Sequence, residues 1–139
     1  MKFYLDTNIF LDLLLRRNPH LETAADIFDR GVRKDLKLYT SSHCIATVHY
    51  VCKKFFKAQL REVIGELLNF ITVIAVDEEI LRKSLNSQHK DFEDAIQILC
   101  AHQIKNLDAI ITRNIKDFST SEIEVFTPDQ ALTYIQKKK

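Results

Sequence analysis

The sequence predicts an α/β fold in which a mainly parallel central sheet is flanked by helices on both faces, in a three-layer α/β/α arrangement. Short apolar runs alternate along the chain with longer segments whose apolar residues recur at helical spacing. Strands that alternate with helices are typical of βαβ units, which build parallel sheets covered by helices. The segment 91–105 is apolar on nearly every side, which indicates a helix enclosed within the protein.

Each apolar run or periodic segment defines one expected element. We expect strands at residues 3–5, 36–40, 72–76, 108–112 and 124–126. We expect helices at residues 7–15, 20–34, 59–70 and 91–105. A further helix is capped by Ser41 or Ser42 and ends near residue 57. Asp77 is expected to begin a short helix, and Pro128 opens the last one.

Composition and charge indicate one ordinary globular domain spanning residues 1–139. The chain is 46% hydrophobic and 28% charged with a net charge of +1, so no global field draws it toward nucleic acid or membranes. No apolar stretch has transmembrane length and no secretion signal is recognisable, so we expect a cytoplasmic protein. The cysteines, Cys44, Cys52 and Cys100, form no CxxC pair and are expected to be buried free thiols. With only two glycines, the chain has no glycine-rich phosphate loop.

Several polar side chains follow strands or begin helices, where an α/β sheet binds its ligands. Asp6 follows the first strand, and Asn114 and Asp117 follow the strand at 108–112. Loops after parallel strands share one edge of the sheet, so these three side chains should be neighbours. Asp94 lies in the first turn of the enclosed helix and joins them if that helix points its amino end at the same edge.

Clustered carboxylates repel one another unless a cation neutralises them. Oxygen ligands suit a hard ion such as Mg²⁺ or Mn²⁺. Such an ion can activate water and stabilise an in-line displacement at phosphorus. The chemistry indicated is phosphodiester hydrolysis, which requires no nucleophilic side chain.

Each acid also has a simpler structural explanation. Asp6 could cap the helix that follows it, and for this residue alone capping and metal binding explain the pattern equally well. Asp91 is better explained as a helix cap, and Glu93 as a solvated charge in the first helical turn. Asp117 could cap a turn. The convergence of the acids favours a metal site more than any one of them does.

Three segments resemble the PIN-domain family in order and spacing: LDTNIFLD at 5–12, DFEDA at 91–95 and ITRNIKDF at 111–118. The likeness spans essentially the whole chain. Members of this family are metal-dependent ribonucleases related in fold to flap-type nucleases, and many are toxins of bacterial toxin–antitoxin pairs.

The resemblance implies a site and a set of partners. Asp6, Asp94 and Asp117 would be catalytic acids that bind Mg²⁺ or Mn²⁺. Asn114 and Thr112 would support them. The substrate would be RNA, and the chain would form a homodimer and bind a small antitoxin-like protein.

One departure from the family pattern concerns the helix that begins near Ser42. Many family members carry a Glu there, but in this chain Thr47 stands at its position and residues 41–60 contain no acid. A hydroxyl can hold a metal-bound water but brings no charge, so Thr47 is expected to support the site while a second ion binds more weakly. His49 is expected at a surface or partner contact, and Asp12 as a solvated helix residue.

RNA binding would require positive charge near the acids. Arg113, beside the proposed acids, is our first candidate for a phosphate contact, and Arg16 and Arg17 are further candidates. The basic cluster of Lys53, Lys54, Lys57 and Arg61 is better explained as a solvated helix face.

Three functions remain open on the sequence. The first is a Mg²⁺- or Mn²⁺-dependent endoribonuclease. The second is a PIN-like module that binds RNA or a protein without cleaving, which the missing Glu favours. The third is a receiver-like signalling module, which needs an acid pair after the first strand. Because Asp6 stands there alone, this function ranks last.

Overall fold

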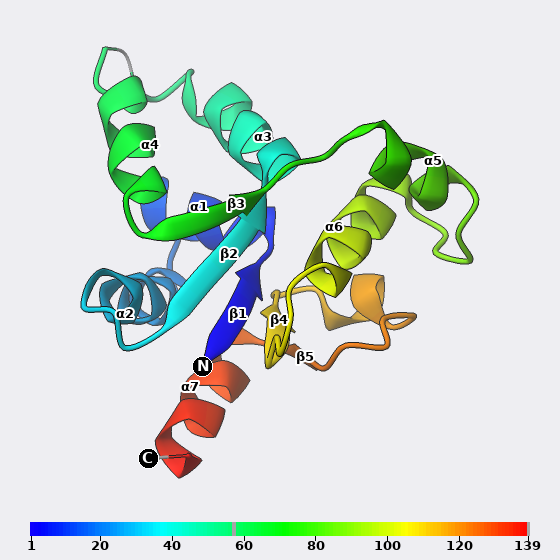
Figure 1. Ribbon diagram of the computed structural model, residues 1–139. Coiled ribbons are helices and arrows are strands. Elements are labelled where there is room, and N and C mark those ends of the chain that lie inside the picture. Colours follow the sequence, from blue (N-terminus) through cyan, green and yellow to red (C-terminus); the bar gives the residue numbers. More distant parts are fainter. Residues whose placement is uncertain (57, 139) are drawn as a thin grey trace.

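The strands form one parallel sheet, which confirms the predicted α/β fold (Figure 1). A computed structural model describes residues 1–56 and 58–138. The five strands lie in the order β3-β2-β1-β4-β5, and each adjacent pair is parallel. Their bounds are β1 Lys2–Leu5, β2 Lys37–Ser41, β3 Ile71–Ile74, β4 Ala109–Ile111 and β5 Val125–Phe126.

Helices connect the strands, as the alternating sequence pattern predicts. Before β3 the chain forms α1 Thr7–Leu14, α2 Leu21–Val32, α3 Ser42–Cys52 and α4 Leu60–Leu68. After β3 it forms α5 Glu78–Leu85, α6 Phe92–His102, the short 3-10 helix η1 Ile115–Phe118 and α7 Pro128–Lys137. Among these described helices, none is long and apolar enough to cross a membrane.

Two helical features differ from the expectations. α3 ends at Cys52 rather than near residue 57, because the chain turns so that Phe56 packs against the core; Lys57 lies outside the described residues. The second difference is η1, which places Asp117 inside a 3-10 turn whose cap position is Asn114. Capping by Asp117 is therefore wrong.

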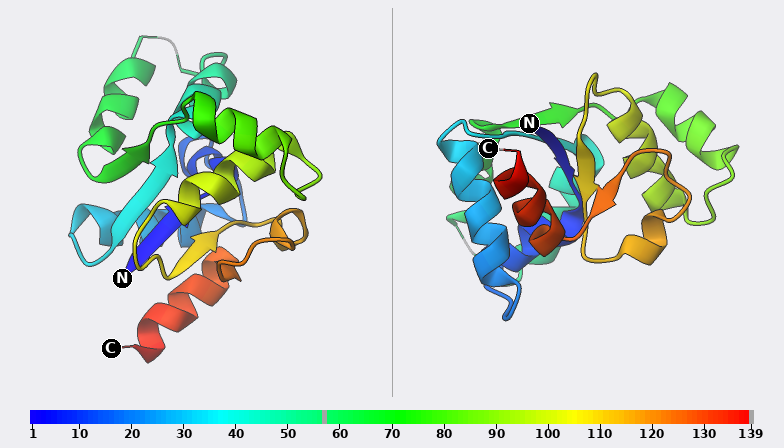
Figure 2. Two further views of the ribbon diagram at one scale, coloured as in Figure 1. Left: turned by 45° about the vertical axis from the view of Figure 1, so that its right-hand side comes forward. Right: turned by 90° about the horizontal axis from the view of Figure 1, so that it is seen from below.

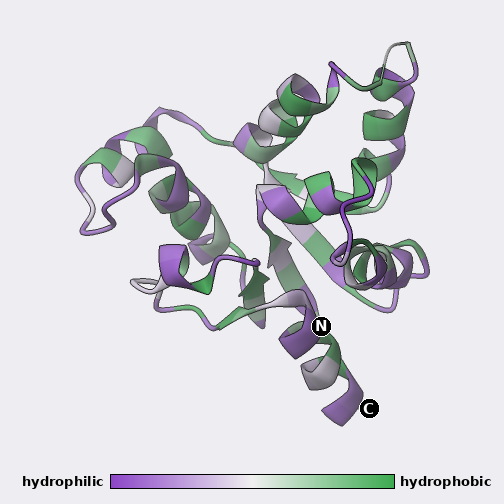
Figure 3. Cartoon of the chain, turned by 180° about the vertical axis from the view of Figure 1, so that it is seen from behind, coloured by the Kyte–Doolittle hydropathy of each residue, from purple (hydrophilic) through white to green (hydrophobic). Residues whose placement is uncertain are grey.

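Alternate residues of the central strands face two separate hydrophobic cores. Phe3 and Leu5 of β1 join the core formed with α1, α2, α3, α4 and α7. Tyr4 points to the opposite face and joins the core formed with α5, α6 and η1. Figure 2 shows these two helical layers on either side of the sheet. In Figure 3 the strands between them are mostly hydrophobic, as expected of a parallel sheet covered on both faces.

The strand order places a topological switch point beside β1. β2 and β3 lie in succession on one side of β1, and the chain then crosses over the sheet so that β4 and β5 lie on the other side of β1. The segments that follow β1 and β4 therefore leave the sheet in opposite layers, and a crevice opens beyond the strand ends. The amide of Asp6 donates to the carbonyl of Ile111 at 3.0 Å, which joins the two strand ends directly.

Side chains cap the helices where the sequence suggested. Ser41 accepts from the amide of Cys44 and so begins α3, while Asp77 and Asp91 begin α5 and α6 in the same way. Within the described residues, Cys44, Cys52 and Cys100 are buried free thiols, as predicted.

Candidate functional site

A cavity of about 260 Å³ lies beyond the carboxyl ends of β1 and β4. Segments far apart in the sequence meet around it: the start of α1, one side of α3, the first turns of α6, and the loop and 3-10 helix after β4. We call it the acid cavity. It is lined by Asp6, Thr7, Asn8, Leu11, His43, Thr47, Glu93, Asp94, Gln97, Asn114 and Asp117.

Asp6 is held at the floor of this cavity by three hydrogen bonds. Its Oδ1 accepts from the amide of Thr7 at 2.6 Å and from Nε2 of Gln97 at 2.9 Å. Its Oδ2 accepts from the hydroxyl of Thr112 at 2.8 Å. The residue is only 5% exposed, and this burial raises the pKa of the carboxyl, although the three donors oppose the shift.

Asp94 faces the same cavity from the first turn of α6. Its amide donates to Asp91, the helix cap, at 3.0 Å. Burial and repulsion from the neighbouring carboxylates, Asp91 and Asp117 foremost, raise the pKa of Asp94 to about 7. Asp6, Glu93, Asp94 and Asp117 line this one cavity, so their negative charges repel one another.

Of the other predicted site residues, some line the acid cavity and one is buried behind it. Asn114, Asp117 and Thr47 line the acid cavity. Thr112 is fully buried behind Asp6; its hydroxyl donates to that carboxylate and accepts from the amide of Asn114 at 3.0 Å. The structure thus gathers around Asp6 every residue for which the sequence suggested a catalytic or supporting role.

Gln97 is a cavity residue that the sequence reasoning missed. It lies one turn after Asp94 on α6, is 5% exposed, and bonds Asp6 directly. Its spacing of three residues from Asp94, which puts both on one helix face, was the signal available. His43 was also missed; its Nε2 lies 3.7 Å from the Glu93 carboxylate. Glu93 is exposed, as predicted.

The expectation that Asp12 is solvated is wrong. Asp12 is 0% exposed and accepts two hydrogen bonds from Arg113, at 2.6 Å from Nε and 3.1 Å from Nη2. Arg17 approaches the same carboxylate at 3.8 Å. Asp12 lies among the buried residues of α1, beside Leu11, and a single acid in an apolar helix gave no sign of a partner 101 positions away.

Arg113, the candidate phosphate contact, lies outside the acid cavity. Two of its three guanidinium nitrogens bond Asp12, and the side chain borders a separate cavity beside His20 and Thr127. Its evident structural task is to fix the chain between Thr112 and Asn114 against α1.

The predicted basic cluster is divided between the turn after α3, which carries Lys53 and Lys54, and the first turn of α4, which carries Arg61. Lys53, Lys54 and Arg61 are exposed, as expected of a solvated face, and Lys57 is not among the described residues. His49 is half-buried in another shallow cavity between α3 and α4, away from the acids.

Comparison with known families shows to which protein family the chain belongs. The profile of the family described as PIN domain matches residues 2–116, more than four fifths of the chain. This chain belongs to the PIN domain family. The matched region contains Asp6 and Asp94 and ends one residue before Asp117.

Solved structures share the fold of this PIN domain. A toxin–antitoxin complex from Klebsiella pneumoniae contains a chain 27% identical, with TM-score 0.65, covering 90% of this chain and 96% of that one. A VapBC2 structure from Rickettsia felis, bound to a DNA fragment from its promoter, has 20% identity and TM-score 0.62 over 91% and 97%. VapC20 of Mycobacterium tuberculosis, a toxin that cleaves the sarcin–ricin loop, has 13% identity and TM-score 0.60 over 78% and 86%. Comparison with curated protein sequences finds no significant match.

The donor set of this PIN domain fits a hard divalent cation by its chemistry. Carboxylates of Asp6, Asp94 and Asp117 and the amide oxygen of Asn114 offer the oxygen ligands that Mg²⁺ and Mn²⁺ prefer. Within residues 1–56 and 58–138, no group of three or more His, Cys, Asp or Glu side chains is arranged so that it could hold a metal ion. A cation bound there would offset the repulsion between carboxylates that, together with burial, raises the pKa of Asp94.

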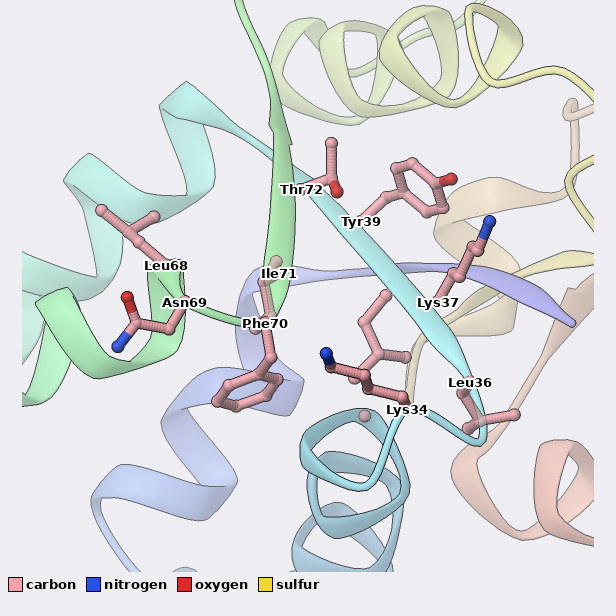
Figure 4. A pocket seen from close by; sticks show the side chains of 11 residues that line it. Lys34, Leu36, Lys37, Tyr39, Leu68, Asn69, Phe70, Ile71 and Thr72 are labelled. Carbon is pink, nitrogen blue, oxygen red and sulfur yellow. The ribbon is translucent and has the colours of Figure 1, made fainter.

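A larger cavity, of about 420 Å³, lies between α2, β2 and the start of β3 (Figure 4). Its lining includes Leu36, Leu38 and Phe70 with the two lysines Lys34 and Lys37, and none of the described residues that line it carries a carboxylate. Mg²⁺ and similar hard cations are bound through oxygen ligands, carboxylates above all, so the smaller acid cavity is the candidate active site.

Proposed function

We propose that this chain is an endoribonuclease that hydrolyses RNA phosphodiesters with Mg²⁺ or Mn²⁺. The observation that carries the proposal is the gathering of Asp6, Asp94 and Asp117 around one cavity at the switch point of the sheet. A divalent cation bound there would activate water and stabilise in-line displacement at phosphorus.

The three acids have different tasks in this proposal. Asp6 is buried and already oriented by its hydrogen bonds, so it is the anchoring ligand. Burial and the neighbouring carboxylates raise the pKa of Asp94 to about 7, so Asp94 would lose its proton as a cation arrives. Asp117, on the short helix η1, completes the acidic wall, and Asn114 adds a neutral oxygen.

Thr47 sets the charge of the site. It lines the acid cavity from α3 where many family members carry a Glu. Its hydroxyl can orient a metal-bound water but leaves the site with one negative charge fewer. We infer that one ion binds firmly and that a second binds more weakly.

Arg113 remains a candidate phosphate contact through Nη1, the guanidinium nitrogen that makes no bond to Asp12. The geometry favours its role as an anchor of the loop that carries Thr112 and Asn114.

We further propose that the chain is the toxin of a toxin–antitoxin pair, acts in the cytoplasm and forms a homodimer. The Klebsiella and Rickettsia structures named above, which contain toxin–antitoxin pairs, support the pairing. Exposed apolar side chains on and after α3 and α4, Tyr50, Phe55 and Leu68, are consistent with a protein partner in this region.

The proposal is tested by cleavage of varied single-stranded and structured RNAs with Mn²⁺ or Mg²⁺. Wild type should cleave, EDTA should stop cleavage, and Asp6→Asn and Asp94→Asn should each lower the rate by at least about 100-fold, since each removes a charged ligand. Asp29→Asn, which changes an exposed acid on α2 paired with Arg33, is the matched control and should cleave normally.

The alternative is a PIN module that binds RNA or a protein without cleaving, and Thr47 is the observation that favours it. This alternative predicts RNA retention without metal-dependent products on any RNA. Metal-dependent cleavage that stays at the wild-type rate in both Asp6→Asn and Asp94→Asn would show that these acids do not carry the activity, and the proposed site would be rejected.

A further inference from the structure

Gln97 occupies an unusual place beneath the acid cavity. It lies on α6 and is 5% exposed. Its amide group connects the proposed active site to a polar network within the core formed with α5, α6 and η1. Its Oε1 accepts from the Tyr4 hydroxyl at 3.2 Å and from the Cys44 thiol at 2.9 Å. Its Nε2 donates to Oδ1 of Asp6 at 2.9 Å.

The orientation of the Gln97 amide is determined by its partners. An ionised Asp6 carboxylate only accepts hydrogen bonds, so the group that faces it must be the NH₂. Tyr4 and Cys44 each have a hydrogen to donate, so the oxygen faces them. A flipped amide would place two acceptors together on one side, and the network therefore holds the side chain in one state.

The hydrogen bonds to Asp6 also determine which of its oxygens remains available. An ionised carboxylate has about four lone-pair sites, two on each oxygen. The amide of Thr7 and Nε2 of Gln97 occupy both sites of Oδ1. Thr112 occupies one site of Oδ2, so the remaining site belongs to Oδ2.

We propose that Gln97 is a positioning residue that occupies Oδ1 of Asp6, so that Asp6 offers a divalent cation one oxygen, Oδ2. The inference rests on the proposed metal-dependent function and deepens it. Gln97 acts through Asp6 rather than on RNA. Without its amide, Oδ1 keeps only the Thr7 amide as a donor, and the carboxylate is held less firmly in the orientation that Thr112 supports.

The test is Mn²⁺ affinity, measured by isothermal titration calorimetry on folded wild type, Gln97→Met and Ile98→Val. Gln97→Met keeps the length of the side chain and removes its hydrogen bonds, and should weaken Mn²⁺ binding about 10-fold, the usual cost of losing a residue that orients a ligand. Ile98→Val is the matched control, because Ile98 is fully buried next to Gln97 on α6 but belongs to the hydrophobic core. It should keep its Mn²⁺ affinity within twofold even where its thermal midpoint falls.

Tyr4→Phe provides a milder variant that retains the ring and Gln97 while removing one donor to Oε1. It should weaken Mn²⁺ binding about two- to threefold, and it keeps the proposal testable if Gln97→Met does not fold. In RNA cleavage at saturating Mn²⁺, Gln97→Met should lower kcat and leave KM for RNA unchanged, since the residue does not touch the substrate.

The possible failures are distinguishable. Suppose that wild type binds Mn²⁺ and cleaves RNA with it. The positioning role is then overturned if folded Gln97→Met keeps its Mn²⁺ affinity within twofold of wild type, or if Ile98→Val loses as much affinity as Gln97→Met. In either case the ribonuclease proposal stands. If wild type neither binds Mn²⁺ nor cleaves RNA, the proposed function itself fails and Gln97 loses its role with it.

Discussion

At the scale of single residues, Asp6 combines two features that the sequence presented as alternatives. It caps α1, because its side chain accepts from the amide of Thr7. A cap requires only this local donor, but Asp6 also accepts from Gln97 on α6 and from Thr112 after β4. Donors from three parts of the chain converge on one carboxylate, which is what a preorganised ligand requires.

Asp6→Asn separates the two roles. Asn is as good a helix cap as Asp. Its neutral amide also avoids the cost of removing a charge from water, which is what raises the pKa of the Asp6 carboxyl. We expect the free energy of unfolding in EDTA to stay within about 1 kcal/mol of wild type, while Mn²⁺ affinity falls at least about 10-fold. Urea unfolding and calorimetry measure the two quantities. Lost stability with unchanged Mn²⁺ affinity would establish Asp6 as a cap alone.

Asp94 makes a pH prediction whose sign follows from its raised pKa. Its ordinary value is 3.8 and burial with neighbouring acids raises it to about 7 in the folded protein. Between these values the folded state holds a proton that the unfolded state has lost. The free energy of unfolding therefore falls through Asp94 as pH rises from about 4 to about 7. Above that range the contribution of Asp94 is constant.

Asp94→Asn should remove this contribution. Urea unfolding midpoints measured in EDTA between pH 4.5 and 8 should show wild type losing stability relative to Asp94→Asn as pH rises. The difference between the two curves isolates Asp94, because both proteins retain Asp6, whose raised pKa acts in the same direction. Parallel curves would show that Asp94 does not titrate with a raised pKa.

At the scale of secondary-structure elements, an ion pair ties α1 to the segment between β4 and η1. Asp12 on α1 is buried and accepts hydrogen bonds from both Nε and Nη2 of Arg113. Arg113 lies between Thr112, which bonds Asp6, and Asn114, which lines the acid cavity. The pair thus holds in place the loop that carries two supporting residues of the site.

Asp12→Ala should destabilise the protein by about 3 kcal/mol, because it leaves a partly buried guanidinium without its partner. Asp29→Ala removes an exposed pair with Arg33 on α2 and should cost about 0.5 kcal/mol or less. Urea unfolding of both variants provides the measurement. Equal losses in the two would mean that Asp12 and Arg113 contribute no more than a surface pair.

The elements also show which features local sequence patterns can predict. Periodicity and capping residues give the strands and helices to within a few residues, because backbone preference and burial act over short windows. The end of α3 at Cys52 was missed, since tertiary packing of Phe56 decides it. Asp12 and Gln97 look like ordinary helical polar residues; their burial depends on partners 101 and 91 positions away in the sequence.

At the scale of the whole molecule, strand order determines where the site forms. With β1 between β2 and β4, the ends of β1 and β4 meet at the switch point, and Asp6 and Thr112 become partners across 106 residues. The rule that parallel strands share one carboxyl edge brought Asp6, Asn114 and Asp117 together from sequence alone. It did not reveal the hydrogen bonds beneath them, since those depend on side chains of the enclosed helix α6.

Because the acid cavity draws on α1, α3, α6 and η1 together, a cation bound there should stabilise the entire fold. Binding to the folded state alone contributes RT ln(1 + [Mn²⁺]/Kd), about 2.7 kcal/mol at 100 times Kd, which raises Tm by roughly 10 °C for a chain of this size. Differential scanning calorimetry across a Mn²⁺ series should show Tm rising with the logarithm of concentration in wild type and in Asp29→Asn. Asp94→Asn should shift far less at the same concentrations, because each acid removed weakens the cation site that links these elements. A rise of equal size in Asp94→Asn would place the stabilising ion elsewhere on the surface and remove the acid cavity as the metal centre.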